Sequence, residues 1–192
     1  IAKSFIESGI YKNILIVASE KLSSIVDYTD RNTCVLFGDG ASACVVSNKG
    51  AGLLVHDLSL GSDGQYADLL ILPGGGSRNP ATAETIAKKM HFVQMEGKEI
   101  FKHAVRRMAS AATIVLKQAG LVQEDIRWLV PHQANIRIIE AIAKRFSYST
   151  QQVFLTVQKY GNTSASSIGI ALDELIRAVS YTHLRAHETR HD

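Results

Sequence analysis

The strongest chemical signal in this sequence of 192 residues is the segment Pro131-His-Gln-Ala-Asn135. It follows the apolar run 128–130 and opens a helical pattern, so His132 is predicted to stand where a strand ends and a helix begins. Sites in open α/β folds usually lie at such junctions. The positive end of a helix dipole disfavours imidazolium, so His132 is expected to stay neutral and to donate from one ring nitrogen. A histidine that caps the helix or fills the core fits the same spacing.

A second polar segment, Tyr160-Gly-Asn-Thr-Ser-Ala-Ser-Ser167, also lies between a predicted strand and a predicted helix. Asn162, next to Gly161, could direct an amide N–H at a developing negative charge. Asn, Thr and Ser are also common at helix N-caps, so a capping role is the alternative for this stretch.

The elements that must position these segments alternate along the chain. Short apolar runs of strand length are followed by stretches with apolar residues every three or four positions, which predicts a layered α/β fold. The predicted strands span residues 13–19, 34–37, 43–47, 53–60, 128–130 and 153–157. The predicted helices span residues 1–8, 97–120 and 134–146, and a last helix follows residue 163.

Several features of the strands and loops are more specific. Strand 13–19 is almost continuously apolar, which is typical of a strand buried on both faces. Gly38-Asp-Gly40 is predicted to be the turn between the second and third strands. Residues 61–83 are rich in Gly, Pro, Ser and Asp, and such long irregular loops are often functional.

The helices show clear apolar stripes. Periodicity places Phe101 of helix 97–120 in the core, and Gly120 is expected to end that helix. In helix 134–146 the predicted inward positions are Ile138, Ile139, Ile142 and Phe146.

The composition narrows the possible functions. The net charge of +3 is too small to indicate nucleic-acid binding, but a basic patch for an acidic partner is compatible with it. No apolar run has the length of a membrane span, so no membrane role is expected. Cys34 and Cys44 form no CxxC pair, and both are expected to be buried thiols of a cytoplasmic protein. The sequence begins without Met inside a predicted helix, which indicates a fragment.

Taken together, the two polar segments closely resemble the β-ketoacyl-acyl carrier protein synthase III family. The resemblance covers about residues 1–180. Its further matching stretches are Thr29-Asp-Arg31, Phe37-Gly-Asp-Gly-Ala41, Asn79-Pro80, Met95-Glu-Gly-Lys-Glu-Ile-Phe101 and Trp128-Leu-Val130. It implies a thiolase-like layered αβαβα fold, incomplete here, with residues 1–49 ending an N-terminal half and residues 50–180 forming most of a C-terminal half. It also implies a homodimer.

The resemblance further implies a decarboxylative Claisen condensation that starts fatty acid synthesis. In the family a cysteine takes an acyl group from acyl-CoA, and malonyl-acyl carrier protein then loses carbon dioxide and attacks that acyl group. His132 and Asn162 match the histidine and asparagine that bind the malonyl thioester oxygen. Gly97 and Asn135 match positions along the pantetheine channel, and Arg31 matches a position at the nucleotide end of coenzyme A.

Arg137 matches a basic residue that meets the carrier protein. Coenzyme A enters as a thioester substrate, and no other cofactor and no metal are implied. Two alternatives remain. One is a related condensing enzyme of a secondary pathway, and the other is a non-catalytic module that binds coenzyme A or the carrier protein.

The sequence departs from the family at both ends. The family's nucleophile lies in an Ala-Cys-(Ser/Ala)-Gly turn, which is expected upstream of residue 1, so this chain alone should not condense anything. Residues 181–192 lack an apolar stripe and are predicted to be a non-native or disordered tail. They contain His187-Glu-Thr-Arg-His191, the pattern of zinc proteases. Without a packed helix and supporting residues around it, no zinc site is expected there.

Overall fold

The chain folds into a mixed α/β structure, obtained as a computed structural model that describes residues 1–50 and 52–188, with side chains through Val179. The longer elements are α1 (Ala2–Glu7), β1 (Asn13–Lys21), β2 (Asp39–Ser47), α3 (Gly97–Ala119), α4 (Ile136–Arg145) and α6 (Ser166–Glu188). The shorter ones are η1 (Leu22–Ser24), η2 (Gly64–Leu69), β3 (Leu70–Ile71), α2 (Ala83–Ala87), β4 (Gln94–Met95), η3 (Gln123–Asp125), η4 (Thr150–Gln152) and α5 (Val157–Tyr160). Within the described residues, no helix combines the length and the hydropathy needed to cross a membrane.

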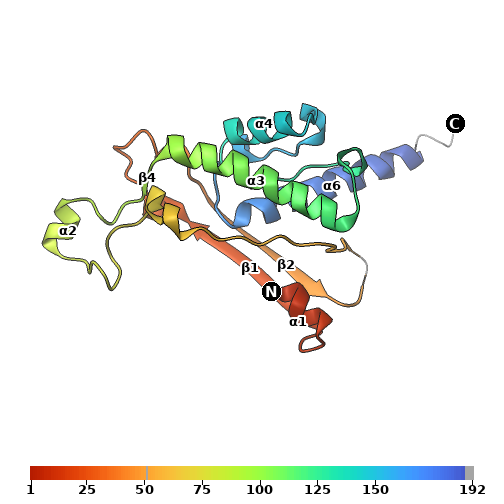
Figure 1. Cartoon of the computed structure of the whole chain (residues 1–192), viewed down its shortest axis with the longest axis horizontal. Helices are drawn as coiled ribbons and strands as arrows, with labels where there is room; N and C mark the ends of the chain where they lie inside the picture. Colours follow the sequence, from red (N-terminus) through yellow and green to blue (C-terminus); the bar gives the residue numbers. More distant parts are fainter. Residues whose placement is uncertain (51, 189–192) are drawn as a thin grey trace.

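The strands β1 and β2 form a long antiparallel pair, which runs from the α1 end of the molecule toward the other elements (Figure 1). Helix α6 packs on this pair, mainly against β2. The approach is close at Gly169, where a Cβ atom would lie 2.3 Å from Ser42 Oγ. A residue without a side chain is therefore needed at that position for α6 to sit on the strands.

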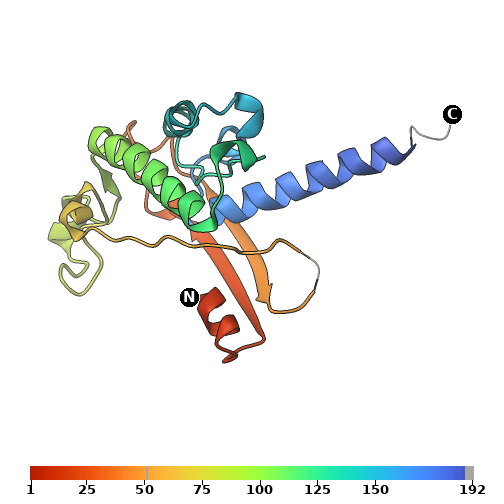
Figure 2. The ribbon, with the colours of Figure 1, turned by 45° about the vertical axis from the view of Figure 1, so that its right-hand side comes forward.

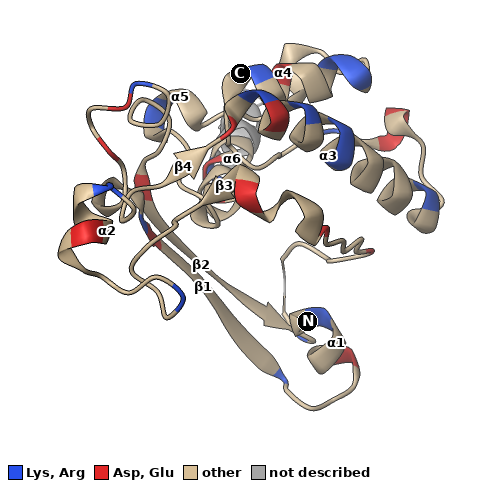
Figure 3. Cartoon of the chain, turned by 60° about the vertical axis from the view of Figure 1, so that its left-hand side comes forward, with Lys and Arg blue, Asp and Glu red and all other residues tan. Residues whose placement is uncertain are grey.

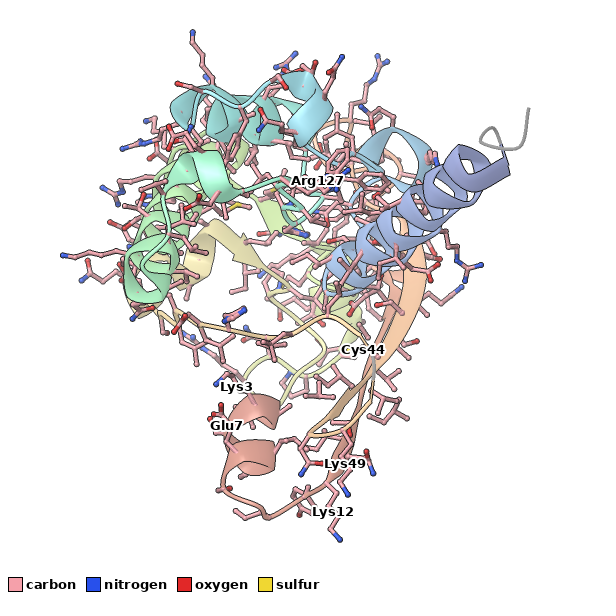
Figure 4. All side chains as sticks on the ribbon, turned by 90° about the vertical axis from the view of Figure 1, so that its right-hand side faces the viewer. Lys3, Glu7, Lys12, Cys44, Lys49 and Arg127 are labelled. Atoms are coloured by element: carbon pink, nitrogen blue, oxygen red, sulfur yellow. The ribbon has the colours of Figure 1, made fainter. Side chains whose placement is uncertain are left out.

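The predicted strand 13–19 is confirmed as part of β1, but its predicted burial on both faces is wrong. Leu15 and Val17 are 65% and 61% exposed. The reason is that β1 pairs only with β2 in the described structure, and α1 and α6 are the elements packed on this pair. On β2, Cys44 is exposed for the same reason (Figure 4), and Cys34 is half-buried. The prediction that both thiols are buried is therefore wrong.

Other predicted strands are also corrected. Residues 34–36 form turns, Phe37 makes a single bridge to Asn162, and the predicted turn residue Asp39 already begins β2. Residues 53–60 form no strand. Extended segments become strands only when a neighbour pairs with their backbone groups, and no described segment does so beside 53–60.

The two late strands, 128–130 and 153–157, are shorter than predicted. They meet in one parallel bridge between Leu129 and Val153, with backbone hydrogen bonds on both sides of it. The chain then turns into α5 at Val157.

The predicted helices 97–120 and 134–146 are confirmed as α3 and α4, which lie side by side (Figure 1). Gly120 ends α3 in the left-handed conformation, with φ of +67°. The four predicted inward positions of α4 are all buried, and Ala109 of α3 packs against three of them. The four are Ile138, Ile139, Ile142 and Phe146.

Helix α6 extends away from the rest of the molecule toward the C-terminus (Figure 2). Its backbone is helical through Glu188. That residues 181–192 are a non-native or disordered tail stays a prediction. The predicted tail and its His187–His191 pattern end outside the described residues.

Candidate active site

His132 lies in the loop that links the Leu129 bridge to α4, and it is half-buried. Its Nδ1 atom is 2.6 Å from the Oγ atom of Ser167, in the first turn of α6. Burial lowers the pKa of His132 below its ordinary value of 6.5. Burial therefore favours the neutral ring, whereas the sequence argument for a neutral ring rested on the helix dipole.

Gln133, the next residue, is 1% exposed and fastens this loop to the segment before α5. Its amide nitrogen donates to the carbonyl oxygens of Pro131 at 2.8 Å and Phe154 at 3.2 Å. Its Oε1 atom accepts from the backbone N–H groups of Thr156 at 2.8 Å and Val157 at 3.1 Å. All four hydrogen-bonding positions of this carboxamide are occupied, so the loop carrying His132 is held rigidly.

Asn162 is fixed by its backbone and by one side-chain atom. Its N–H donates to the Leu36 carbonyl at 2.8 Å, and its own carbonyl accepts from Gly38 at 2.9 Å. Its Oδ1 atom accepts from the N–H of Ser164 at 2.9 Å. Its Nδ2 group makes no hydrogen bond to any residue that the structure describes, so it is free to donate to a ligand.

Gly161 permits this placement of Asn162. Its φ is +67°, and a Cβ atom there would lie 2.9 Å from the carbonyl oxygen of Leu36. Both the backbone conformation and the close approach require glycine.

His132 and Asn162 line the same two cavities. The smaller, of about 270 Å³, is walled mainly by apolar side chains from the region of η1, from β3 and from Val93. The larger, of about 1300 Å³, extends along the start of α3 and the start of α4. The two polar residues that the sequence singles out thus both belong to the walls of these two cavities.

The other predicted site residues are distributed unevenly. Gly97, Asn135 and Arg137 line the larger cavity. Asn135 also caps α4, because its Oδ1 accepts from the N–H of Arg137 at 2.8 Å. Arg31 is exposed and is not among the lining residues, although its neighbour Asn32 is.

Phe101 corrects the prediction from periodicity. It is 37% exposed and lines the larger cavity instead of filling the core. Basic residues recur along α3 and α4 (Figure 3), and Lys98, Lys102 and Arg137 are those that line the larger cavity.

Sequence reasoning missed Ser167 and Gln133 as parts of the site. The available signal for Ser167 was only its place in a Ser-rich helix start, which capping explains equally well. For Gln133 the signal was an amide directly beside the candidate histidine. Neither pattern reveals that the Ser167 hydroxyl accepts a hydrogen bond from the backbone N–H of Gln133, 34 residues away in the sequence.

Two family models match the chain. The model of 3-oxoacyl-[acyl-carrier-protein] synthase III matches residues 1–64, and the model of its C-terminal part matches residues 116–183. The β-ketoacyl-[acyl-carrier-protein] synthase III of Chlamydia caviae is 62% identical over 178 residues, which are 92% of this chain and 53% of that protein. The enzyme of the same name from Caldanaerobacter subterraneus is 51% identical, over 92% of this chain and 54% of its own length.

Solved structures agree with these matches. A 3-oxoacyl-(acyl-carrier-protein) synthase III at 28% identity superposes with a TM-score of 0.85, over 93% of this chain and 56% of the other. The one from Aquifex aeolicus is 42% identical, with a TM-score of 0.79 over 92% of this chain and 53% of its own. The fold is accordingly the thiolase-like α/β fold. The chain belongs to the 3-oxoacyl-[acyl-carrier-protein] synthase III family, and it spans about half the length of the relatives it matches.

Proposed function

We propose that this chain is about half of an acyltransferase that condenses acyl-CoA with malonyl-acyl carrier protein at the start of fatty acid synthesis. The observation that carries the proposal is the shared position of two neutral donors, His132 and Asn162, on the walls of both cavities. Family membership supports the reaction class, because both named relatives are β-ketoacyl-[acyl-carrier-protein] synthases.

The two donors suit the decarboxylation step. When the malonyl thioester loses carbon dioxide, the electron pair of the broken C–C bond moves toward the thioester carbonyl and leaves an enolate oxygen. N–H groups of His132 and Asn162 would bind that oxygen. The enolate carbon would then attack the acyl-cysteine carbonyl, form the new C–C bond and expel the cysteine thiolate. Loss of one such donor typically lowers the rate by ~10²–10³.

The neutral state of His132 is essential to this role. An imidazolium would stabilise the enolate more strongly at first, but it would also protonate it. Burial lowers the pKa of His132, so the ring donates a hydrogen bond without giving up a proton easily.

The larger cavity suits the long pantetheine arm that both substrates share. Gly97 and Asn135 would line that arm. Arg31, exposed beside the lining residue Asn32, would meet the nucleotide end of coenzyme A. Arg137 is exposed on α4, where it would meet the acidic carrier protein.

The nucleophile is proposed to come from a segment that precedes residue 1. Neither Cys34 nor Cys44 is among the residues lining the two cavities. On this proposal residues 1–49 end the N-terminal half of the enzyme and residues 50–180 form most of its C-terminal half. The exposed apolar side chains of β1 and β2 would be covered by the remaining half of the enzyme or by the second subunit of a homodimer. The enzyme would act in the cytoplasm.

The test uses the full-length protein, including the upstream segment. Incubation with labelled acyl-CoA should give an acyl-enzyme thioester, and addition of malonyl-acyl carrier protein should release carbon dioxide and the 3-ketoacyl product. His132→Ala and Asn162→Ala should each slow carbon dioxide release by ~10²–10³. Substrate binding with no acyl-enzyme would instead identify a non-catalytic binding module and overturn the proposal.

A further inference from the structure

Ser167 lies directly beneath the candidate histidine. Its Oγ atom is 2.6 Å from His132 Nδ1 and 3.3 Å from the backbone nitrogen of Gln133, and the residue is only 2% exposed. We propose that Ser167 is a positioning residue that fixes His132 in the tautomer with its hydrogen on Nε2. The functional part of this inference rests on the proposed role of His132 as an oxyanion donor.

The assignment follows from counting hydrogens around Ser167 Oγ. The backbone N–H of Gln133 can only donate, so Oγ accepts from it. The serine hydroxyl has one hydrogen of its own, and Nδ1 of His132 is the one remaining partner that the described residues offer it. If Ser167 donates to Nδ1, that nitrogen carries a lone pair, and the hydrogen of the neutral ring must be on Nε2.

The opposite tautomer fits this site poorly. With hydrogen on Nδ1, two N–H groups would point at the same Oγ atom, and the buried hydroxyl hydrogen would have no acceptor among the described residues. Buried polar groups in proteins are almost always paired. The arrangement therefore selects one tautomer.

The surroundings prevent the arrangement from relaxing. Gln133 is held by its four side-chain hydrogen bonds, so its N–H cannot easily turn away from Ser167. Ser167 itself belongs to α6, the helix that packs on β2. The Ser167 hydroxyl thus links the loop that carries His132 to helix α6.

The tautomer matters for the proposed reaction. Nδ1 is occupied by Ser167, so Nε2 is the ring nitrogen available to a thioester oxygen in the cavities that His132 lines. A hydrogen there stabilises the developing negative charge, whereas a lone pair would repel it. Ser167 acts on the substrate only through His132.

The direct test is nuclear magnetic resonance of the full-length protein with ¹⁵N-labelled histidine, above the pKa of His132. The His132 signals are assigned by their loss in His132→Gln. Nδ1 should resonate as an unprotonated imidazole nitrogen and Nε2 as a protonated one. A protonated Nδ1 in the unmodified protein would overturn the proposal, whether or not any Ser167 variant folds.

The variant test compares two adjacent serines. Ser167→Ala should shift the His132 signals toward a mixture of tautomers and lower kcat for condensation on the order of 10-fold to 10²-fold, as small misplacements of catalytic groups do. Ser166→Ala is the matched control, because Ser166 is 0% exposed and its hydroxyl donates to the Thr163 carbonyl at 2.8 Å instead. It should leave the His132 signals unchanged.

The two measurements separate the two proposals. Unchanged His132 signals in a folded Ser167→Ala protein would overturn the positioning role of Ser167. A shifted tautomer with an unchanged condensation rate would support that positioning and overturn the oxyanion role of His132.

Discussion

Replacing Gln133 by Met should destabilise the site region severely, although methionine has a similar length and shape. The carboxamide makes four hydrogen bonds to backbone groups of Pro131, Phe154, Thr156 and Val157. Pro131 and Thr156 are themselves buried, so their carbonyl and N–H would lose a partner without gaining water. Each buried group left unpaired costs about 1–3 kcal/mol, which gives an expected loss of about 2–6 kcal/mol for these two.

The assay is urea unfolding of the full-length protein together with amide hydrogen exchange. Exchange at Thr156 and Val157 should accelerate strongly in Gln133→Met, because their N–H groups lose the Oε1 acceptor. Gln151→Met is the matched control, since Gln151 is exposed and should change the stability by no more than about 0.5 kcal/mol. Equal stability and equal exchange in the two variants would refute the reasoning.

Three further outcomes are expected. The condensation rate and the stability contributed by neutral His132 should be highest above its ordinary pKa of 6.5 and should decline as pH falls through its lowered pKa. A condensation rate that rises on acidification would contradict the assignment. The pKa of Asp27, held at about 2 first by its hydrogen bond from Lys89, should rise toward 3.8 in Lys89→Met when followed by carboxyl titration in magnetic resonance. Arg137→Ala should slow reaction with malonyl-acyl carrier protein in a salt-dependent way and spare acyl transfer from coenzyme A, whereas Lys144→Ala, outside the cavity lining, should alter neither.

Helices α3 and α4 were predictable from the sequence because their periodicity reflects local geometry. The buried positions Ile138, Ile139 and Ile142 follow from the 3.6-residue repeat, and Gly120 marks a helix end by its freedom to adopt positive φ. The segments holding His132 and Asn162 were recognisable because a short run of polar residues just before a helix is a local pattern.

Pairing between distant segments could not be predicted in the same way. An apolar run such as 53–60 has the residues of a strand, but whether it becomes one depends on a partner elsewhere in the chain. The exposure of Leu15 and Val17 likewise depends on what covers β1, not on their own hydrophobicity. The contact of Ser167 with His132 is set by how α6 packs, which no local pattern records.

The most direct test of the central claim is the rate of carbon dioxide release from malonyl-acyl carrier protein by full-length Asn162→Asp. This change keeps the size and the Oδ1 contact to Ser164, but it replaces the free Nδ2 donor with a carboxylate oxygen. If Asn162 and His132 together bind the enolate oxygen, the rate should fall by at least ~10² while the acyl-enzyme still forms. A rate within about twofold of the unmodified enzyme would be a much smaller decrease than the loss of a donor causes. That result would contradict the account.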